Sequence, residues 1–132
     1  MRGLDTNVLV RYLVADDNTQ MALAEEVIEG GPEQGEDLFV AVPVICELAW
    51  VLERSYGYSR SEIAVAIEVL LTLERVQVED EPSVRRSLMA FASGRAGLAD
   101  CLIGELGRKA GCRDTVTFDR ALKSIPGFTV IS

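Results

Sequence analysis

Short apolar runs alternate with longer segments of helical periodicity along the whole chain. The run from Leu38 to Val42 has the length and composition of a buried strand. After it, Ile45, Leu48 and Leu52 repeat at helical spacing. Strands separated by helices favour an α/β fold with a parallel β-sheet flanked by helices on both faces. In such a sheet, ligands bind beyond the carboxyl ends of the strands.

The same signals predict the remaining elements. We expect strands at residues 2–5, 38–42, 76–78, 113–117 and 128–131. Helices are expected at residues 7–14, 43–56 and 98–110, the last followed by Gly111. A second helix should run from a cap at Asp16 or Asp17 to residue 28, and another from the capping box of Ser59 and Glu62 towards residue 73. One more helix is expected from residue 82 to the break at 94–97. A loop is expected at 32–37, and a short helix or turn is expected after Asp119.

The length of 132 residues and the absence of repeats or long linkers predict one domain over residues 1–132. No apolar stretch approaches the roughly 18 to 20 residues that a membrane-spanning helix needs. The N-terminus lacks the basic and apolar regions of a signal peptide. We therefore expect a cytoplasmic protein without a membrane partner.

The chain contains no histidine, which excludes serine–histidine triads, cysteine–histidine proteases and histidine-based ribonucleases. Any hydrolysis must use carboxylates, whose oxygens favour hard cations such as Mg²⁺ or Mn²⁺. Cys46, Cys101 and Cys112 are odd in number and lack Cys-x-x-Cys spacing, so we predict buried, reduced thiols.

The formal net charge of −8 argues against a protein that coats duplex nucleic acid. It does not exclude a nuclease, because part of the negative charge would be concentrated in a cation site. Eleven of the thirteen basic residues are arginines, which suit bidentate phosphate recognition. Surface ion pairs explain most of these arginines equally well.

Two acids in the first half of the chain are candidate metal ligands. Asp5 follows the first predicted strand, where a parallel sheet presents reactive groups, but it also precedes a helix that it could cap. Glu47 is bracketed by apolar residues, and an ionised glutamate in such a setting needs a cation or an arginine partner. The alternative is an exposed Glu47 paired with Arg54.

Two further candidates lie in the second half. Asp100 stands in the first turn of a helix among apolar neighbours, where it could point into a pocket or only complement the helix dipole. Asp119 follows a strand and could instead cap residues 120–123. Each acid is ambiguous alone, but together the four suggest one cation pocket.

Taken together, these motifs resemble those of the PIN-domain family, specifically the VapC-like toxins of toxin–antitoxin pairs. The resemblance covers nearly the full length. It is carried by Leu4-Asp5-Thr6-Asn7-Val8-Leu9, Glu47-Leu48, Leu98-Ala99-Asp100-Cys101-Leu102-Ile103 and Thr117-Phe118-Asp119-Arg120-Ala121-Leu122.

The resemblance implies a metal-dependent endoribonuclease with one or two Mg²⁺ or Mn²⁺ ions, a cognate antitoxin and a homodimer. Asp5, Glu47, Asp100 and Asp119 map onto the family's acidic positions, with Asp5 and Asp100 expected as the principal ligands. The resemblance also suggests that Thr6, Asn7 and Thr117 orient the ligands or the attacking water. Here Ala121-Leu122 follows the last acid, in a region that varies in the family, which weakens the match at Asp119.

Three arginines near the expected edge of the site are candidate RNA phosphate contacts: Arg95, Arg113 and Arg120. Two rival functions compete with the nuclease. A phosphatase or receiver-type domain fits poorly, because Asp5-Thr6-Asn7 replaces the Asp-x-Asp that a phosphatase needs. The second rival is a catalytically silent PIN-like module that acts through partner or RNA binding, with the apolar hairpin of residues 43–73 as an interface.

Overall fold

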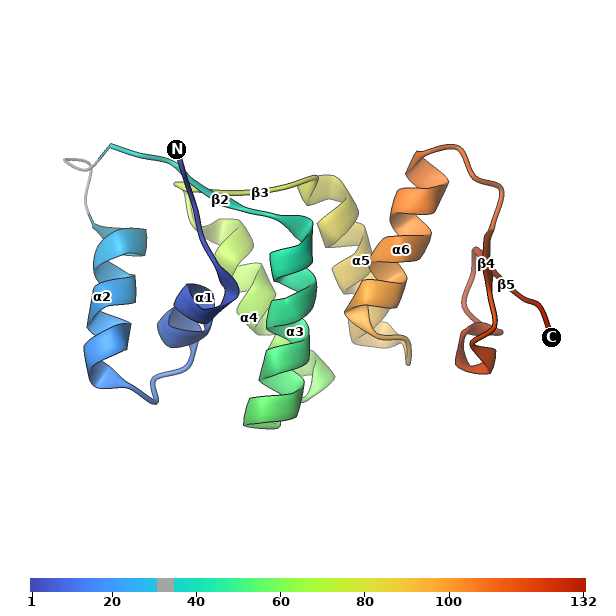
Figure 1. The fold of residues 1–132 in the computed structure, drawn as a ribbon, viewed down its shortest axis with the longest axis horizontal. Helices are drawn as coiled ribbons and strands as arrows, with labels where there is room; N and C mark the ends of the chain where they lie inside the picture. The colour runs from blue at the N-terminus through green and yellow to red at the C-terminus, as the bar shows by residue number, and fades with distance from the viewer. Residues whose placement is uncertain (31–34) are drawn as a thin grey trace. The chain divides into compact units, whose positions relative to one another are not determined.

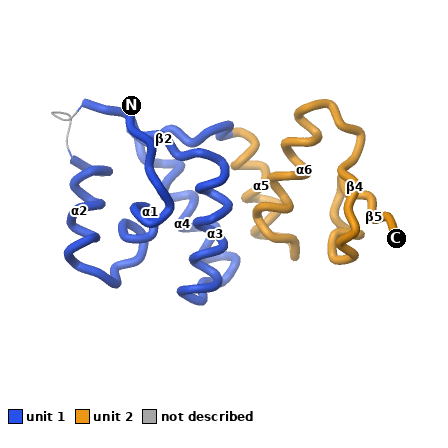
Figure 2. The backbone as a smooth tube through the Cα atoms, viewed as in Figure 1, with its two compact units in different colours: residues 1–81 blue, residues 82–132 orange. Residues whose placement is uncertain are grey.

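The structure is a computed structural model that describes residues 1–30 and 35–132. It divides into two compact units, residues 1–81 and 82–132, shown in different colours in Figure 2. Each unit is described by itself below. That residues 1–132 form a single domain stays a prediction.

In the described part of unit 1, residues 1–30 and 35–81, the chain forms three short parallel strands and four helices; Figure 1 labels them. The strands pair in the order β1-β2-β3, with Arg2 opposite Leu38 and Phe39 opposite Gln77. In chain order the elements are β1 (Arg2–Gly3), α1 (Thr6–Leu13), α2 (Asn18–Glu29), β2 (Leu38–Val40), α3 (Val42–Tyr56), α4 (Arg60–Thr72) and β3 (Val76–Val78).

The core of unit 1 lies between one face of this sheet and the helices. Leu38, Val40, Val76 and Val78 alternate with less buried residues, so they share the buried face of β2 and β3. On the other face Phe39 is half-buried and Gln77 is exposed. The helices fill the core with side chains that are at most 1% exposed, namely Leu9, Ile45, Leu48, Leu52, Ile63, Ile67 and Leu70.

The ends of the helices in unit 1 follow from local sequence signals. The Ser59 hydroxyl accepts a hydrogen bond from Glu62 N at 3.2 Å, and Ser59 N donates to Glu62 Oε1 at 3.0 Å. This reciprocal pair is the predicted capping box. Asp17 caps α2 through Gln20 N, as one of the two predicted caps. Gly57 ends α3 with a φ of +67°, a conformation that glycine adopts without strain.

Unit 2 contains two helices, two parallel strands and a short 3₁₀ turn. Its elements are α5 (Glu81–Ser93), α6 (Leu98–Lys109), β4 (Thr115–Thr117), η1 (Arg120–Leu122) and β5 (Phe128–Val130). The helix α6 packs closely on β5, because a Cβ placed at Gly104 would lie 2.9 Å from Phe128 Cε2. Gly111 follows this helix with a φ of +97°, at the predicted position.

The predicted α/β class and the parallel pairing of the strands are confirmed. The five strands within the described residues fall into two sheets, one in each unit, and most are shorter than predicted. Part of the predicted loop at 32–37 lies outside the described residues. The prediction that all three thiols are buried was wrong for Cys112, which is exposed after the end of α6. Cys101 is buried, and Cys46 is half-buried. None of the helices in residues 1–30 and 35–132 has the length and apolarity needed to cross a membrane.

Candidate metal centre

Asp5 lies two residues beyond β1 and caps α1. Its Oδ1 accepts a hydrogen bond from Thr6 N at 2.8 Å. Its Oδ2 has no hydrogen-bond partner within residues 1–30 and 35–132, and the side chain is exposed. The cap and a ligand role are therefore compatible, since one oxygen bonds the helix and the other can meet a cation.

Glu47 is exposed on α3, which corrects the prediction of an apolar environment. Trp50 on the same helix is 58% exposed, so the apolar residues around Glu47 do not all enclose it. The alternative partner Arg54 instead lies over the Trp50 ring, with 5.6 Å between Cζ and the ring centroid. In the described part of the chain the Glu47 carboxylate has no hydrogen bond or ion pair, so it is available to a ligand.

Asp5 and Glu47 line the same pocket, of about 260 Å³, within unit 1. Its volume leaves room for several water molecules. The predicted polar residues Thr6 and Asn7 line it as well, so the structure brings four of the predicted site residues together. The remaining lining residues are Val10, Arg11, Val51, Ser55 and Tyr56.

Sequence reasoning missed Arg11, Ser55 and Tyr56 as residues of this pocket. Helical spacing could have found two of them. Arg11 is four residues after Asn7, and Ser55 is eight residues after Glu47, so each shares a helix face with a predicted residue. Tyr56 carries no comparable signal, because it reaches the pocket from the last turn of α3.

The hydroxyl of Thr6 is buried without a protein partner. The residue is 5% exposed, and its Oγ1 has no hydrogen bond within the described residues. An unsatisfied buried hydroxyl costs about 1–3 kcal/mol, so such groups commonly bond to water or a ligand. Its place in the wall of the pocket fits a hydroxyl that orients a ligand of a bound cation.

Asp100 and Asp119 line one pocket of about 490 Å³ within unit 2. Asp100 is half-buried in the first turn of α6, and its carboxylate has no partner in the described part of the chain. Gly97 caps this helix without a side-chain hydrogen bond, and a Cβ there would lie 3.6 Å from Asp100 Oδ2. The absence of a side chain at Gly97 thus keeps this side of the carboxylate open.

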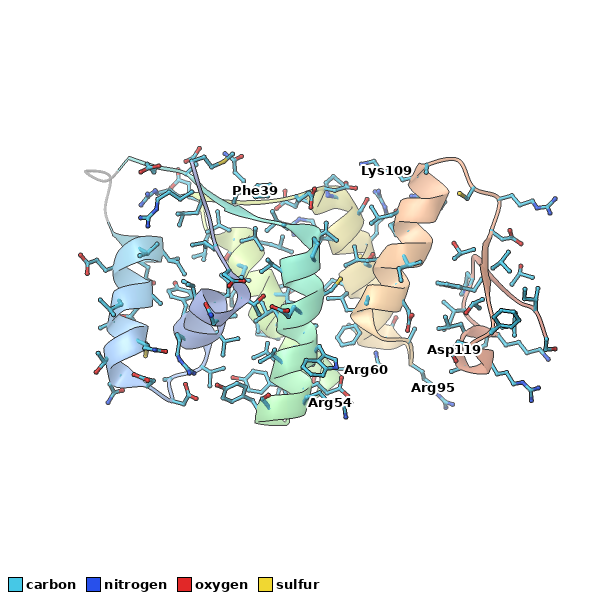
Figure 3. The ribbon with its side chains drawn as sticks, viewed as in Figure 1. Phe39, Arg54, Arg60, Arg95, Lys109 and Asp119 are labelled. Carbon is cyan, nitrogen blue, oxygen red and sulfur yellow. The ribbon has the colours of Figure 1, made fainter. Side chains whose placement is uncertain are left out.

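Asp119 is exposed and caps η1, where its Oδ1 accepts a hydrogen bond from Ala121 N at 2.9 Å. Thr117 Oγ1 in turn accepts a hydrogen bond from Asp119 N at 3.0 Å. Thr117 therefore holds the backbone of a candidate ligand, and its role in orienting ligands or the attacking water stays a prediction. Figure 3 labels Asp119 beside this turn.

The three predicted phosphate contacts are all exposed, and one of them lies at the pocket of Asp100 and Asp119. Arg95 lines the pocket of Asp100 and Asp119, in the loop before α6 (Figure 3). Arg113 and Arg120 do not line that pocket. Their contact with RNA stays a prediction.

The side chains of both pockets suit a hard cation. Both offer carboxylate and hydroxyl oxygens, and the pocket of unit 1 adds the amide of Asn7; these are ligands that Mg²⁺ and Mn²⁺ prefer, and the chain has no histidine to favour a softer metal. Burial raises the pKa of the Cys46 thiol, which disfavours the thiolate that a soft metal needs. Within residues 1–30 and 35–132, no three cysteine or acidic side chains group closely enough to hold a metal ion. That all four acids share one site stays a prediction.

The Thr6 hydroxyl can be tested by Thr6→Val, which keeps the shape of the side chain. Because the hydroxyl is unpaired in the fold, we expect the free energy of unfolding in EDTA to be unchanged or raised by about 1 kcal/mol. For the metal-dependent RNA cleavage that the sequence resemblance implies, we expect a fall of about 10- to 100-fold, as for other groups that orient metal ligands. Thr19→Val, at an exposed first-turn threonine of α2, is the control, and equal activity of the two variants would contradict the role.

Comparisons with known proteins cover nearly the whole chain. The family model of the PIN domain matches residues 4–127. A VapC ribonuclease of Aquifex aeolicus is 31% identical over 132 residues, which span 100% of this chain and 96% of that protein. A crystal structure of VapC20 from Mycobacterium tuberculosis, described as a Sarcin-Ricin loop cleaving toxin, has a TM-score of 0.45 and 17% identity, with 96% of each chain covered.

Proposed function

Because the chain belongs to the PIN-domain family, we propose that it is a metal-dependent endoribonuclease and the toxin of a toxin–antitoxin pair. Its substrate would be an RNA phosphodiester bond, and its cofactor one or two Mg²⁺ or Mn²⁺ ions. The match to the family over residues 4–127 and the full-length similarity to a VapC ribonuclease support the reaction class.

The observation that carries the metal is the pocket of Asp5 and Glu47, with the unpaired Thr6 hydroxyl in its wall. Two carboxylates in one pocket repel each other, and a divalent cation would relieve that repulsion. Asp100 and Asp119 form the corresponding pair in unit 2. We propose that all four carboxylates serve the reaction, with Asp5 and Asp100 as principal ligands.

When bound, the divalent ion lowers the pKa of a coordinated water and stabilises the charge that develops on the phosphate. The residues of this chain would place that ion and the water. Asp5 offers Oδ2, since its Oδ1 bonds the backbone of α1. Glu47 would act as a ligand or accept a proton from the attacking water, Asp119 would hold a second ion or orient ligands, and Thr6 and Asn7 would orient the water.

Two partners also belong to the proposal. We expect the chain to pair with a cognate antitoxin, as VapC-like toxins do. A basic surface on that antitoxin could neutralise part of the −8 charge of this chain. A homodimer is expected as well. Light scattering of the purified chain would test the dimer, and a monomer at micromolar concentration would contradict it.

The test of the function is cleavage of a mixed RNA pool by the purified chain with Mg²⁺, with Mn²⁺ and with EDTA. We expect endonucleolytic products with either ion and none with EDTA. Cleavage that persists in EDTA would contradict the metal dependence. A folded chain without cleavage in any condition would instead favour the catalytically silent binding module, which binding of the same pool would then examine.

A further inference from the structure

The side chain of Arg11 is fixed by hydrogen bonds from three directions. Its Nη1 donates to Tyr56 OH at 3.1 Å and to Asp16 Oδ1 at 3.1 Å, and its Nε donates to Gln20 Oε1. Tyr56 OH also donates to Asp16 Oδ2 at 2.9 Å, which closes the network. The guanidinium is thus held in one orientation by residues of α2, α3 and the loop before α2.

Arg11 lines two neighbouring pockets of unit 1. One is the pocket of Asp5 and Glu47, and the other is a pocket of about 460 Å³ formed by α1 and α2. Asn7 is the other residue that lines both. A chain that leaves the carboxylate pocket towards the second pocket would therefore pass Arg11.

A purely structural role does not account for the whole guanidinium. The ion pair between Arg11 and Asp16 joins side chains that are 31% and 41% exposed, and surface pairs of this kind contribute little to stability. Nη2 makes no hydrogen bond within residues 1–30 and 35–132, so two N–H donors remain for a ligand. A guanidinium is charged at neutral pH, and the hydrogen bond with Tyr56 raises the pKa of Arg11 further.

We propose that Arg11 binds a backbone phosphate of RNA held at the Asp5–Glu47 pocket. A guanidinium with a fixed orientation and two remaining N–H donors suits the tetrahedral phosphate anion. RNA must approach a chain of net charge −8 and a pocket with two carboxylates, so a guanidinium in the pocket wall adds to the attraction that a bound cation would supply. This inference rests on the proposed function, because it takes RNA as the substrate.

The test compares RNA binding by the full chain and by Arg11→Gln over a range of salt concentrations, in EDTA so that the RNA stays intact. We expect about tenfold weaker binding and a salt slope that is smaller by about 0.7, the value for one phosphate contact to single-stranded nucleic acid. Arg11→Lys should retain the slope, because it keeps the charge. Arg54→Gln is the matched control, an exposed arginine of unit 1 that lies over Trp50 and lines neither pocket.

A bracing role would give a different pattern. If Arg11 only holds α2 and α3, Arg11→Gln and Tyr56→Phe would lower the free energy of unfolding alike and leave the salt slope unchanged, which would overturn the proposal. If Arg11→Gln weakens the binding of an acidic peptide such as polyglutamate but not that of RNA, Arg11 serves a peptide ligand, which would also overturn the proposal. RNA binding by the wild type in EDTA and the reduced slope in Arg11→Gln, together with no cleavage in Mg²⁺ or Mn²⁺, would overturn the proposed catalysis and leave the Arg11 contact standing. A wild-type chain that binds no RNA in EDTA would overturn the Arg11 contact, whereas the proposed catalysis would still be decided by cleavage with Mg²⁺ or Mn²⁺.

Discussion

Asp5→Asn is expected to lower metal-dependent RNA cleavage by about a thousandfold. A bound divalent ion contributes several kcal/mol to the transition state, and about 1.4 kcal/mol corresponds to a factor of ten in rate. Asparagine keeps the size of the side chain but removes the negative charge that attracts the ion. The loss is measured on one defined RNA under single-turnover conditions with Mg²⁺ or Mn²⁺.

The fold should survive this change because asparagine caps helices as well as aspartate does. The amide oxygen of the new side chain would still accept the hydrogen bond that Asp5 Oδ1 accepts from Thr6 N. We therefore expect the free energy of unfolding in EDTA to stay within about 0.5 kcal/mol of the wild-type value. The substitution thus separates the two roles that remain open from the sequence, the helix cap and the metal ligand.

Metal binding gives a readout that does not depend on catalysis. A ligand present at 100 times its Kd stabilises the folded state by about 2.7 kcal/mol, so Mn²⁺ should raise the melting temperature of the wild type. Asp5→Asn should lose most of this rise, whereas Glu68→Gln, at an exposed acid of α4, should keep it. A folded Asp5→Asn chain with wild-type cleavage and a wild-type response to Mn²⁺ would remove Asp5 from the site.

Local signals in the sequence predicted the helices well. The capping box of Ser59 and Glu62 and the glycine after α6 lie where they were expected, because each depends on a few neighbouring residues. The strands were less predictable at their ends. The chain leaves β1 after Gly3, since Asp5 already caps α1 through its hydrogen bond with Thr6 N. A run of apolar residues does not mark that change.

The environment of Glu47 was the clearest error, and Trp50 explains it. A count of apolar neighbours treats every apolar residue as buried, but the Trp50 ring lies on the surface with Arg54 over it. Pairs that depend on the fold were also out of reach. Arg11 and Tyr56 are 45 residues apart in sequence, and nothing in either local pattern indicates their hydrogen bond.

In unit 2, Asp100→Asn should reduce RNA cleavage about as much as Asp5→Asn does. The Asp100 carboxylate has no partner within the described residues and lines the pocket, so its charge is available to a cation. Asp119 lines the same pocket, but its Oδ1 already bonds Ala121 N. We expect Asp119→Asn to lose only about tenfold, as for a group that orients ligands.

The free energy of unfolding should show whether Asp100→Asn acts through loss of charge or through misfolding. Asp100 lies in the first turn of α6, where a negative charge contributes about 0.3–1 kcal/mol through the helix dipole, so Asp100→Asn should cost no more than this in EDTA. Asp114→Asn is the control in the same unit, because asparagine can still accept the hydrogen bond from Thr129 Oγ1. Full activity of Asp100→Asn with loss of activity in Asp119→Asn would reverse the two roles, since the principal charge would then lie at the exposed cap of η1.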